Sequence, residues 1–465
     1  MLPEKELTGA DLGDIRLNGR LRSLVDAFSA QPTAAIPQAC AGWVDQAYRF
    51  LDNPNVHPDD IRAAHYADTG ARWPSEDEPV LLASDTTWVD YSRHPHASEL
   101  GYQQHLGQHG LFLHSTLACT VAGLPLGLLD QIVWVRDPAH FGKRASRNRK
   151  GTADKESQRW LDALAACIAR RPAGRRILFL ADREGDLYDL FARERPAGVD
   201  LLIRGDGCRR LDGESRLLLE VLAEAAVVAC GEVEVPRKNG QAGRTATAEI
   251  RVQKVRLAVP GSGPRRGRRG PVGVTALLVR EPNPPVGVEP VQWLLLTTWE
   301  VPDAATAWQV VRYYTCRWRV EQYHFTLKSG CAVERLQLET RLRLERALAV
   351  YTVVAVRLLR LTYLARVCPQ QSCEAEFRRL EWQVLLRQVQ RQFGVQGEWE
   401  RSPGLAEMVY WVARLGGYVG RGKKARPGVK VLWRGLRRLH DLVAGYELAH
   451  SLHPQPPPTG QTSVE

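Results

Sequence analysis

The sequence predicts an α/β catalytic core with helical segments on either side of it, and three observations carry this prediction. Short apolar runs alternate with helical patterns between residues 78 and 204, which is typical of an α/β sheet. Two of these runs, 79–84 and 176–181, are followed directly by an aspartate, and open α/β sheets place ligands at the carboxyl ends of their strands. The stretches before residue 70 and after residue 347 show apolar residues at helical spacing instead.

The size and composition of the chain fit a globular protein of two to four domains. It has 465 residues, of which 44% are hydrophobic and 25% charged, and this excludes a wholly disordered chain, collagen and a polytopic membrane protein. The N-terminus lacks a signal-peptide pattern, and Arg357 and Arg360 interrupt the most apolar stretch, 348–364. We therefore expect a cytoplasmic protein without a membrane span.

The charge balance points to a polyanionic partner without proving one. Lys and Arg number 63 against 52 Asp and Glu, which gives a net charge of +11. Such an excess suits binding to nucleic acid, but an arginine-rich solvated surface explains it as well. The nine cysteines include no C-x-x-C pair, which argues against a disulfide scaffold and against a zinc cluster.

The first part of the chain is expected to be helical and then to enter the sheet. Helices are expected over 12–28 and 43–51. Their arginines fit a DNA-binding module and a solvent-exposed helix face equally well. The core strands are expected at 79–84, 111–121, 125–135, 176–181 and 200–204, with a helix over 155–169.

A β-rich insertion is expected at about 206–290, where β-branched runs alternate with Gly and Pro turns. Strand 292–298 should then return to the core, and Asp303 can cap one long helix that reaches about residue 327. Further helices are expected to about residue 450. The glycine-rich basic stretch 261–270 reads as a loop, either a DNA contact or a longer hairpin turn.

The helix after Asp303 carries the most informative residues. At about 100° per residue, four polar side chains share one face within an arc of about 60°: Tyr314, Arg317, Glu321 and Lys328. A helix that packs against an apolar core does not gather a hydroxyl, two cations and a carboxylate in this way. An i,i+4 salt bridge on a surface explains Arg317 and Glu321 but leaves Tyr314 and Lys328 unexplained.

Three carboxylates, Asp85, Asp182 and Glu321, are candidates for one metal site. Converging carboxylates repel one another unless a divalent cation lies between them, and their hard oxygens suit Mg²⁺ or Mn²⁺. Two such ions can activate the attacking oxygen and stabilise the leaving oxygen at a phosphodiester. Arg317 and Lys328 beside the acids would then hold phosphates.

These motifs give the sequence its resemblance to a known family. Residues 314–328 match the signature Y-x2-R-x3-E-x6-K without a break, and 84–87 and 181–186 resemble the two aspartate motifs of the same family. Further blocks resemble its end-binding and C-terminal domains, at 12–16, 48–56, 413–418 and 432–435. Over nearly the whole chain, the sequence resembles the bacterial cut-and-paste DDE transposases of insertion-sequence family four.

The resemblance implies a ribonuclease-H-like catalytic core with a β-rich insertion. It implies that Asp85, Asp182 and Glu321 are the catalytic residues and the metal ligands, with two Mg²⁺ ions per active site that Mn²⁺ can replace. The domains are expected to be an end-binding domain, a catalytic domain, a helical dimerisation domain and a disordered tail, at 1–70, 71–360, 361–453 and 454–465.

The resemblance also implies DNA contacts. Trp293 would stack on a base flipped out near the transposon end, and three residues would hold the phosphates around it: Tyr314, Arg317 and Lys328. Arg204 would lie near the active site. The remaining candidates are arginines of the end-binding domain, Arg16, Arg20 and Arg49.

The function implied is transposition of DNA. The enzyme would bind transposon ends, cleave them through a hairpin intermediate and join the 3′ ends to target DNA. Its partners would be double-stranded DNA, both terminal inverted repeats and target, and a second copy of the chain in a synaptic homodimer, without a membrane. It would act in the bacterial cytoplasm at the nucleoid.

Two other functions compete with this interpretation. A non-catalytic end-binding relative would have lost one of the acids or a terminal domain, and the sequence keeps all of them. A structure-specific nuclease on the same fold would use the acids but would not need Trp293 and the phosphate-holding residues. A strand-transfer assay with end-containing DNA separates the three functions.

Overall fold

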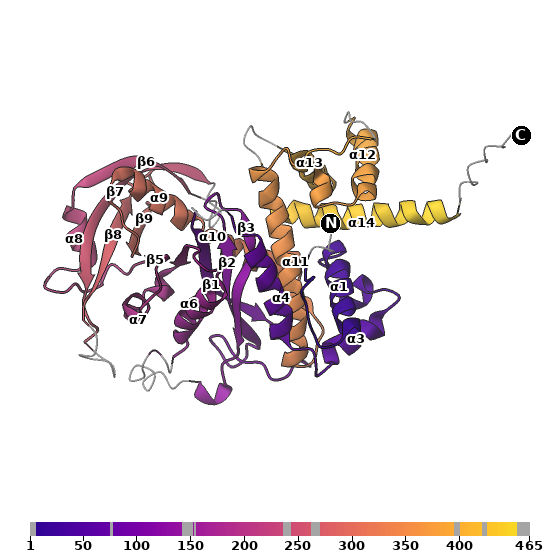
Figure 1. The fold of residues 1–465 in the computed structure, drawn as a ribbon, viewed down its shortest axis with the longest axis horizontal. Helices are drawn as coiled ribbons and strands as arrows, with labels where there is room; N and C mark the ends of the chain where they lie inside the picture. Colours follow the sequence, from indigo (N-terminus) through magenta and orange to yellow (C-terminus); the bar gives the residue numbers. More distant parts are fainter. Residues whose placement is uncertain are drawn as a thin grey trace, which may run out of the picture. The chain divides into compact units, whose positions relative to one another are not determined.

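The computed structural model describes residues 6–74, 78–141, 152, 155–235, 243–261, 270–394, 400–420 and 426–452. Most of the basic loop 261–270 and the whole of the expected tail 454–465 lie outside these residues. The chain forms two compact units (Figure 1). The first contains Met1–His57, Phe325–Leu336 and Arg346–Glu465, and the second contains Pro58–His324 and Gln337–Glu345. The four domain boundaries expected from the sequence stay a prediction.

The second unit is built on one sheet, which has nine strands within the described residues, in the order β3-β2-β1-β4-β5-β9-β8-β7-β6. Its first five strands are β1 Val80–Asp90, β2 Gly110–Cys119, β3 Pro125–Trp134, β4 Ile177–Ala181 and β5 Val199–Arg204. Strands β1, β2 and β3 pair antiparallel, and β4 and β5 continue the sheet parallel to β1. This mixed arrangement is the ribonuclease-H-like core that the resemblance implies, so the predicted fold class is confirmed.

The β-rich insertion extends the same sheet. Its strands are β6 Val227–Val235, β7 Arg244–Leu257, β8 Val272–Arg280 and β9 Gln292–Thr297, all antiparallel. Strand β9 pairs with β5, so the predicted return of the chain to the core is confirmed. Helices α8 Leu218–Glu224 and α9 Ala304–Thr315 pack against the insertion (Figure 1).

Helix α6 Gln158–Arg170 covers one face of the core strands, and α7 Tyr188–Ala192 joins it there. Trp160 and Leu164 of α6 belong to one buried cluster with Val80 and Leu82 of β1. Because side chains alternate along a strand, Ser84 and Thr86 also face α6, while Asp85 faces the opposite side of the sheet. Helix α4 Pro58–Ala71 packs against β3.

Strand β1 does not end at residue 84 as the sequence predicts. It continues to Asp90, because β2 pairs with it antiparallel all the way to Gly110. The parallel pairing with β4 ends much earlier, at Ala83 with Leu180. Asp85 therefore lies inside a strand, two residues beyond the last residue that pairs with β4.

The predicted single helix from Asp303 to residue 327 is also wrong in one respect. Asp303 does cap α9, since its side chain accepts from the Thr306 amide at 2.8 Å. The helix then stops at Thr315, and a second helix, α10 Trp318–Phe325, begins after two residues. The amides of Cys316, Arg317 and Arg319 each bond a carbonyl three residues back, which tightens the backbone into a 3₁₀-like turn. A π-helical turn, Thr326–Gly330, follows α10.

The first unit is helical, and α11 Arg341–Val367 runs through its core. The other helices are α1 Ile15–Ala30, α2 Ile36–Ala39, α3 Val44–Asp52, α12 Arg379–Phe393, α13 Leu405–Leu415 and α14 Val429–Leu452. Tyr351 of α11 stacks on Phe28 of α1 at 4.4 Å between ring centroids, and Arg346 donates to the Val56 carbonyl at 2.7 Å. In length and composition α11 would suffice to cross a membrane, and 94% of its most apolar window is buried within the structure.

Helices α13 and α14 approach each other at two glycines. A Cβ atom at Gly435 would collide with the Val412 carbonyl, and one at Gly416 would collide with the Val431 carbonyl. Glycine at these positions is what lets the two backbones touch.

Gly435→Ala should therefore destabilise the first unit by about 1–3 kcal/mol, because the helices must separate to admit the methyl group. The matched control is Gly445→Ala on the same helix, where nothing lies within 4 Å of the added Cβ. The control should be neutral or stabilising by up to about 1 kcal/mol, since alanine favours a helix. Urea unfolding followed by helical circular dichroism measures both. Equal effects of the two variants would contradict the close approach.

Candidate active site

The structure brings Asp85 and Asp182 to matching positions on neighbouring strands. Ala83 pairs with Leu180 in parallel register, and each aspartate lies two residues further along its chain. Asp182 follows the last residue of β4 and caps the turn η4 Arg183–Gly185, accepting from the Glu184 amide at 2.9 Å. Asp85 accepts from the Thr86 amide at 2.8 Å, and its side chain is 19% exposed.

Arg317 joins the third acid to this pair. Its guanidinium lies 2.5 Å from Oε1 of Glu321, one turn later on α10, and 3.9 Å from Oδ2 of Asp85. The arginine side chain is 9% exposed, whereas that of Glu321 is 48% exposed. Asp85 and Glu321 thus share one buried positively charged group, the guanidinium of Arg317. Tyr314, in the last turn of α9, lies beside it, with the Arg317 guanidinium 5.9 Å from the Tyr314 ring centroid.

The electrostatics of the site favour an additional cation. Burial and the charge of Asp182 raise the pKa of Asp85 to about 7, although Arg317 and the Thr86 amide act in the opposite direction. A carboxylate with such a pKa is destabilised in its charged form, and a divalent ion next to it would stabilise that form. The two aspartates therefore fit a metal ion in donor chemistry and in charge.

Glu321 fits only after a rearrangement. Across the described ranges, no three His, Cys, Asp or Glu side chains are placed closely enough to hold a metal ion together. The carboxylate of Glu321 is held by Arg317, and it must turn away from this partner to join the aspartates.

The base-stacking candidate Trp293 lies at the start of β9 in an aromatic cluster. Its ring centroid is 5.9 Å from that of Tyr314 and 5.6 Å from that of Trp318, and the residue is 7% exposed. Arg204, at the end of β5, donates to the Gln292 carbonyl at 3.3 Å. Burial lowers the pKa of Arg204. Electrostatic interactions with Tyr314 and Asp182 partly offset this lowering, so Arg204 interacts with residues of the same site.

Three buried donors at the site lack a hydrogen-bond partner in the part of the chain that the structure describes. They are the Nε atoms of Arg204 and Arg317 and the hydroxyl of Tyr314. An unpartnered buried donor costs about 1–3 kcal/mol, and charge-assisted bonds to an anionic oxygen would remove this cost. These two arginines are therefore suited to a phosphate.

Lys328 belongs to the other compact unit, on the π-helical turn. It pairs with Glu334 at 3.0 Å and lines a pocket of about 1040 Å³. The pocket is strongly basic, because its other lining residues include Arg335, Lys430, Arg434, Arg437 and Arg438 against Glu334 and Asp441. Within the second unit, the structure brings together three residues of the expected stripe, Tyr314, Arg317 and Glu321.

The three N-terminal arginines lie on the surface of the first unit. Arg16 is 88% exposed at its side chain and pairs with Asp14 at 2.9 Å. Arg20 lies over the ring of Trp43 at 5.1 Å, and Arg49 is exposed on α3.

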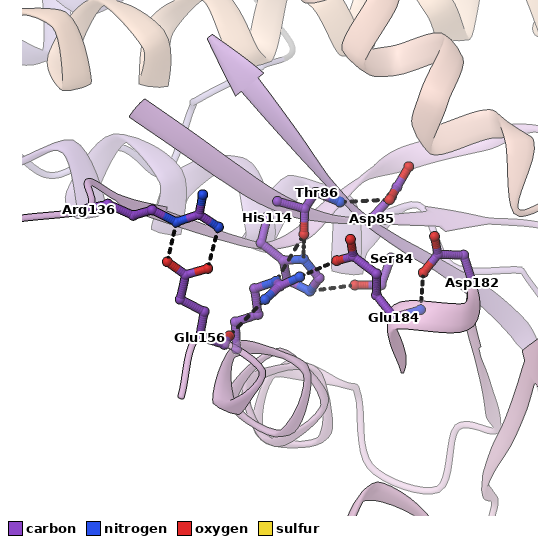
Figure 2. A network of polar contacts seen from close by, with 9 residues as sticks. Ser84, Asp85, Thr86, His114, Arg136, Glu156, Asp182 and Glu184 are labelled. Carbon is purple, nitrogen blue, oxygen red and sulfur yellow. Dashed lines mark hydrogen bonds and ion pairs between the residues drawn. The ribbon is translucent and has the colours of Figure 1, made fainter. Parts of the chain in front are cut away.

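Sequence reasoning missed a polar network on the α6 side of β1. It connects Arg159 of α6 with Thr86 and Glu184. Thr86 and Ser84 each bond to a ring nitrogen of His114 (Figure 2). Figure 2 shows Thr86 directed toward His114 while the Asp85 carboxylate points away. Alternation along β1 was the available signal, because it places the polar Ser84 and Thr86 on the face that Leu82 uses for the core.

Comparisons with known families agree with this geometry. Three family models match the chain: Transposase DNA-binding over residues 3–56, Transposase DDE domain over 154–356, and Transposase Tn5 dimerisation domain over 353–454. The DDE match includes Asp182 and Glu321 and begins after Asp85. Together the matches define a DDE transposase, a metal-dependent enzyme that cuts and joins DNA strands.

The chain belongs to the Tn5-like DDE transposases, as the order of the three matched domains and the type of the dimerisation domain show. It binds DNA, and it forms a homodimer.

Removing the Asp85 carboxylate should flatten part of the pH dependence of stability. The pKa of this group is about 7 in the folded protein and about 3.9 in an unfolded chain, so the folded state binds the proton more tightly. Stability therefore falls as the pH rises from about 4 to about 7.

In EDTA, the unfolding free energy of the wild-type protein should fall between pH 5 and pH 8 by on the order of 2–3 kcal/mol more than that of Asp85→Asn. Urea unfolding at both pH values measures this difference. The control Asp162→Asn removes an exposed aspartate and should behave as the wild type. An equal fall in Asp85→Asn and the wild type would contradict the raised pKa.

Proposed function

We propose that this transposase cuts and pastes DNA through a hairpin intermediate, using Asp85, Asp182 and Glu321 as one catalytic set. The observation that carries the proposal is the parallel register of β1 and β4, which puts two aspartates side by side within reach of the Arg317–Glu321 pair. Carboxylates in this arrangement serve phosphoryl transfer, because it needs positioning and charge stabilisation more than covalent chemistry.

DDE transposases use divalent metal ions, and we propose two Mg²⁺ ions per active site, which Mn²⁺ can replace. The three carboxylates would hold them, and when bound they would activate the attacking oxygen and stabilise the leaving one. The raised pKa of Asp85 supports this assignment, because a carboxylate that burial and Asp182 destabilise gains most from a nearby cation.

Arg317 would couple DNA binding to the assembly of the metal site. Its guanidinium pairs with Glu321 through one nitrogen, and its buried Nε has no partner among the described residues. A DNA phosphate that takes the guanidinium would offer bidentate bonds in exchange for the single contact with Glu321. Glu321 would then be released to join Asp85 and Asp182.

Trp293 and Tyr314 would hold the nucleotide next to the cut. The flipped base would stack on the Trp293 ring, and Arg204 with Arg317 would bind the phosphates beside it. Trp293 is 7% exposed and in contact with Tyr314 and Trp318, so a base can reach its face only if this aromatic cluster opens. Stacking of a base on an aromatic ring contributes about 1–3 kcal/mol, which offsets part of the cost of unpairing.

The longer DNA contacts would come from the first unit. The basic pocket that Lys328 lines would bind the phosphate backbone, and the exposed side chains of Arg16 and Arg49 would meet the transposon end. Arg20 would contribute on the same domain. The homodimer would bracket two inverted repeats in the synaptic complex, with each subunit cutting the end that its partner binds. We place this reaction in the bacterial cytoplasm, at the nucleoid.

The reaction would proceed in four displacements at phosphorus. Water cleaves one strand and frees the 3′-OH of the transposon end. That hydroxyl attacks the opposite strand, which releases the flanking DNA and leaves a hairpin. A second water opens the hairpin, and the 3′-OH then attacks target DNA. The role of Tyr314 is to bind phosphate, since none of these steps needs a protein nucleophile.

Replacing any of the three acids by alanine should abolish cleavage while end binding stays near the wild-type level. The reason is that the acids lie in the second unit, whereas the DNA-binding match covers residues 3–56 of the first. Gel-shift binding and strand nicking with Mg²⁺ on end-containing DNA measure the two properties. Near-native nicking by one of the variants would remove that residue from the ligand set.

Trp293→Ala should spare the first nick and slow hairpin formation, because only the second step needs a base moved out of the stack. Losing about 1–3 kcal/mol of stacking would slow hairpin formation by roughly 5- to 150-fold. An end substrate that lacks the flipped base should partly restore the rate. A gel time course that resolves nicked, hairpin and double-strand-break products tests this. Equal slowing of both steps without rescue would show that Trp293 acts only in packing.

A further inference from the structure

Arg159 of α6 connects the two segments that carry the catalytic aspartates. Its Nε donates to Oγ1 of Thr86 at 3.0 Å, next to Asp85 on β1. Its terminal nitrogen forms an ion pair with Glu184, on the η4 turn that Asp182 caps. One side chain, 12% exposed, thus contacts both motifs from beneath the sheet.

The position of the Arg159 side chain is fixed from several directions. A third nitrogen donates to the Glu156 carbonyl at 2.9 Å, within the first turn leading into α6. The guanidinium also lies 5.6 Å from the ring centroids of both Trp134 and Trp160. Contact with aromatic rings restricts the orientation of a planar guanidinium, so Arg159 contacts Thr86 and Glu184 in a fixed geometry.

The hydrogen bonds beyond Thr86 have one direction that satisfies every group. A guanidinium can only donate, so Oγ1 of Thr86 accepts from Arg159, and its own hydrogen can go to Nδ1 of His114 at 2.9 Å. Nε2 of His114 then donates to the Ser84 hydroxyl at 3.0 Å, which in turn donates to Thr116 at 3.0 Å. Both neighbours of Asp85 are thereby tied to β2, through a chain that starts at Arg159.

The η4 turn is held against α6 by packing as well. A Cβ atom at Gly185 would lie 2.5 Å from that of Ala181 and 3.4 Å from the Trp160 ring. The turn therefore rests directly on α6, and the ion pair of Glu184 with Arg159 fixes where it does so. Asp182 begins this turn, so its carboxylate moves whenever the turn moves.

We propose that Arg159 is a positioning residue that sets the spacing of Asp85 and Asp182 and so their affinity for divalent metal. The inference rests on the metal-ligand roles proposed above. Arg159 belongs to α6, on the side of the sheet away from the Asp85 carboxylate, and acts through Thr86 and Glu184. Groups that orient metal ligands in this way typically change metal affinity by 10- to 100-fold when they are removed.

The test is Mn²⁺ binding to the full-length protein, measured by isothermal titration calorimetry, together with the Mg²⁺ dependence of nicking. Arg159→Gln should weaken Mn²⁺ binding by about 10- to 100-fold and raise the half-saturating Mg²⁺ concentration equally. The maximal rate at saturating Mg²⁺ should change much less, because the ligands themselves remain. End binding should stay at the wild-type level.

The matched control is Arg170→Gln at the other end of α6. Arg170 pairs with Asp130 at 2.5 Å, so this variant removes a comparable ion pair from the same helix without touching either aspartate motif. It should leave Mn²⁺ affinity unchanged, whatever it does to the melting temperature. Equal Mn²⁺ affinities of Arg159→Gln and Arg170→Gln would overturn the proposal, because Arg159 would then be an ordinary structural arginine.

A second pair of variants keeps the test valid if Arg159→Gln does not fold. Thr86→Val keeps the shape of the side chain but removes the hydroxyl, and Thr86→Ser keeps the hydroxyl. Valine should weaken Mn²⁺ binding and serine should restore it, and equal affinities for the two would refute the link.

Asp85→Asn and Asp182→Asn separate this proposal from the function on which it rests. Both should abolish Mn²⁺ binding at the site. If they bind Mn²⁺ as the wild type does, the ligand assignment is wrong and the positioning role falls with it. If they lose binding while Arg159→Gln and Thr86→Val keep it, only the role of Arg159 is wrong.

Discussion

The desolvation of Asp85 next to a second carboxylate, Asp182, governs this active site. Asp85 and Asp182 occupy matching positions on adjacent parallel strands, and burial together with the charge of Asp182 raises the pKa of Asp85 to about 7. Positive charge nearby stabilises the ionised form of such a pair. Within the chain that charge comes from Arg317, which reaches Asp85 and Glu321 together. A divalent ion would supply more charge at shorter range, which is why the same geometry suits metal-dependent phosphoryl transfer.

The pairing of the sheet strands places the two carboxylates next to each other and holds them there. Antiparallel pairing with β2 carries β1 past Asp85, so the aspartate is held at both of its neighbours instead of lying on a loose strand end. Parallel pairing with β4 stops just before the two acids, at Ala83 with Leu180. The insertion then returns through β9 beside β5, and this pairing brings Trp293 and Arg204 to the side where Tyr314 and Arg317 lie. The β-rich segment thus completes the site as well as extending the sheet.

Much of this could be predicted from the sequence, and the failures have physical causes. Apolar runs located β2, β3, β4 and β5 because these strands are buried, and Asp303 marked the start of α9 because a capping side chain is a local feature. The end of β1 could not be found, since its pairing with β2 depends on residues about 30 positions away. The break at Cys316 and Arg317 could not be found either, because helical periodicity does not reveal a turn that tightens to 3₁₀ hydrogen bonds. Arg159 was missed because its partners Thr86 and Glu184 are distant in sequence, and nothing local distinguishes it from other arginines of the chain.

The broken helix has a consequence that a continuous one would not have. In an unbroken helix, Arg317 and Glu321 would be a simple i,i+4 pair on one surface. Because α9 ends at Thr315 and α10 begins at Trp318, Arg317 lies at the junction, where its guanidinium can face Asp85, Glu321 and Tyr314 together. An arginine so placed can exchange carboxylate partners for phosphate ones without moving its backbone. Under the function proposed above, Glu321 would join the two aspartates only when a DNA phosphate has taken its arginine partner, so the metal site would be complete only with the substrate seated.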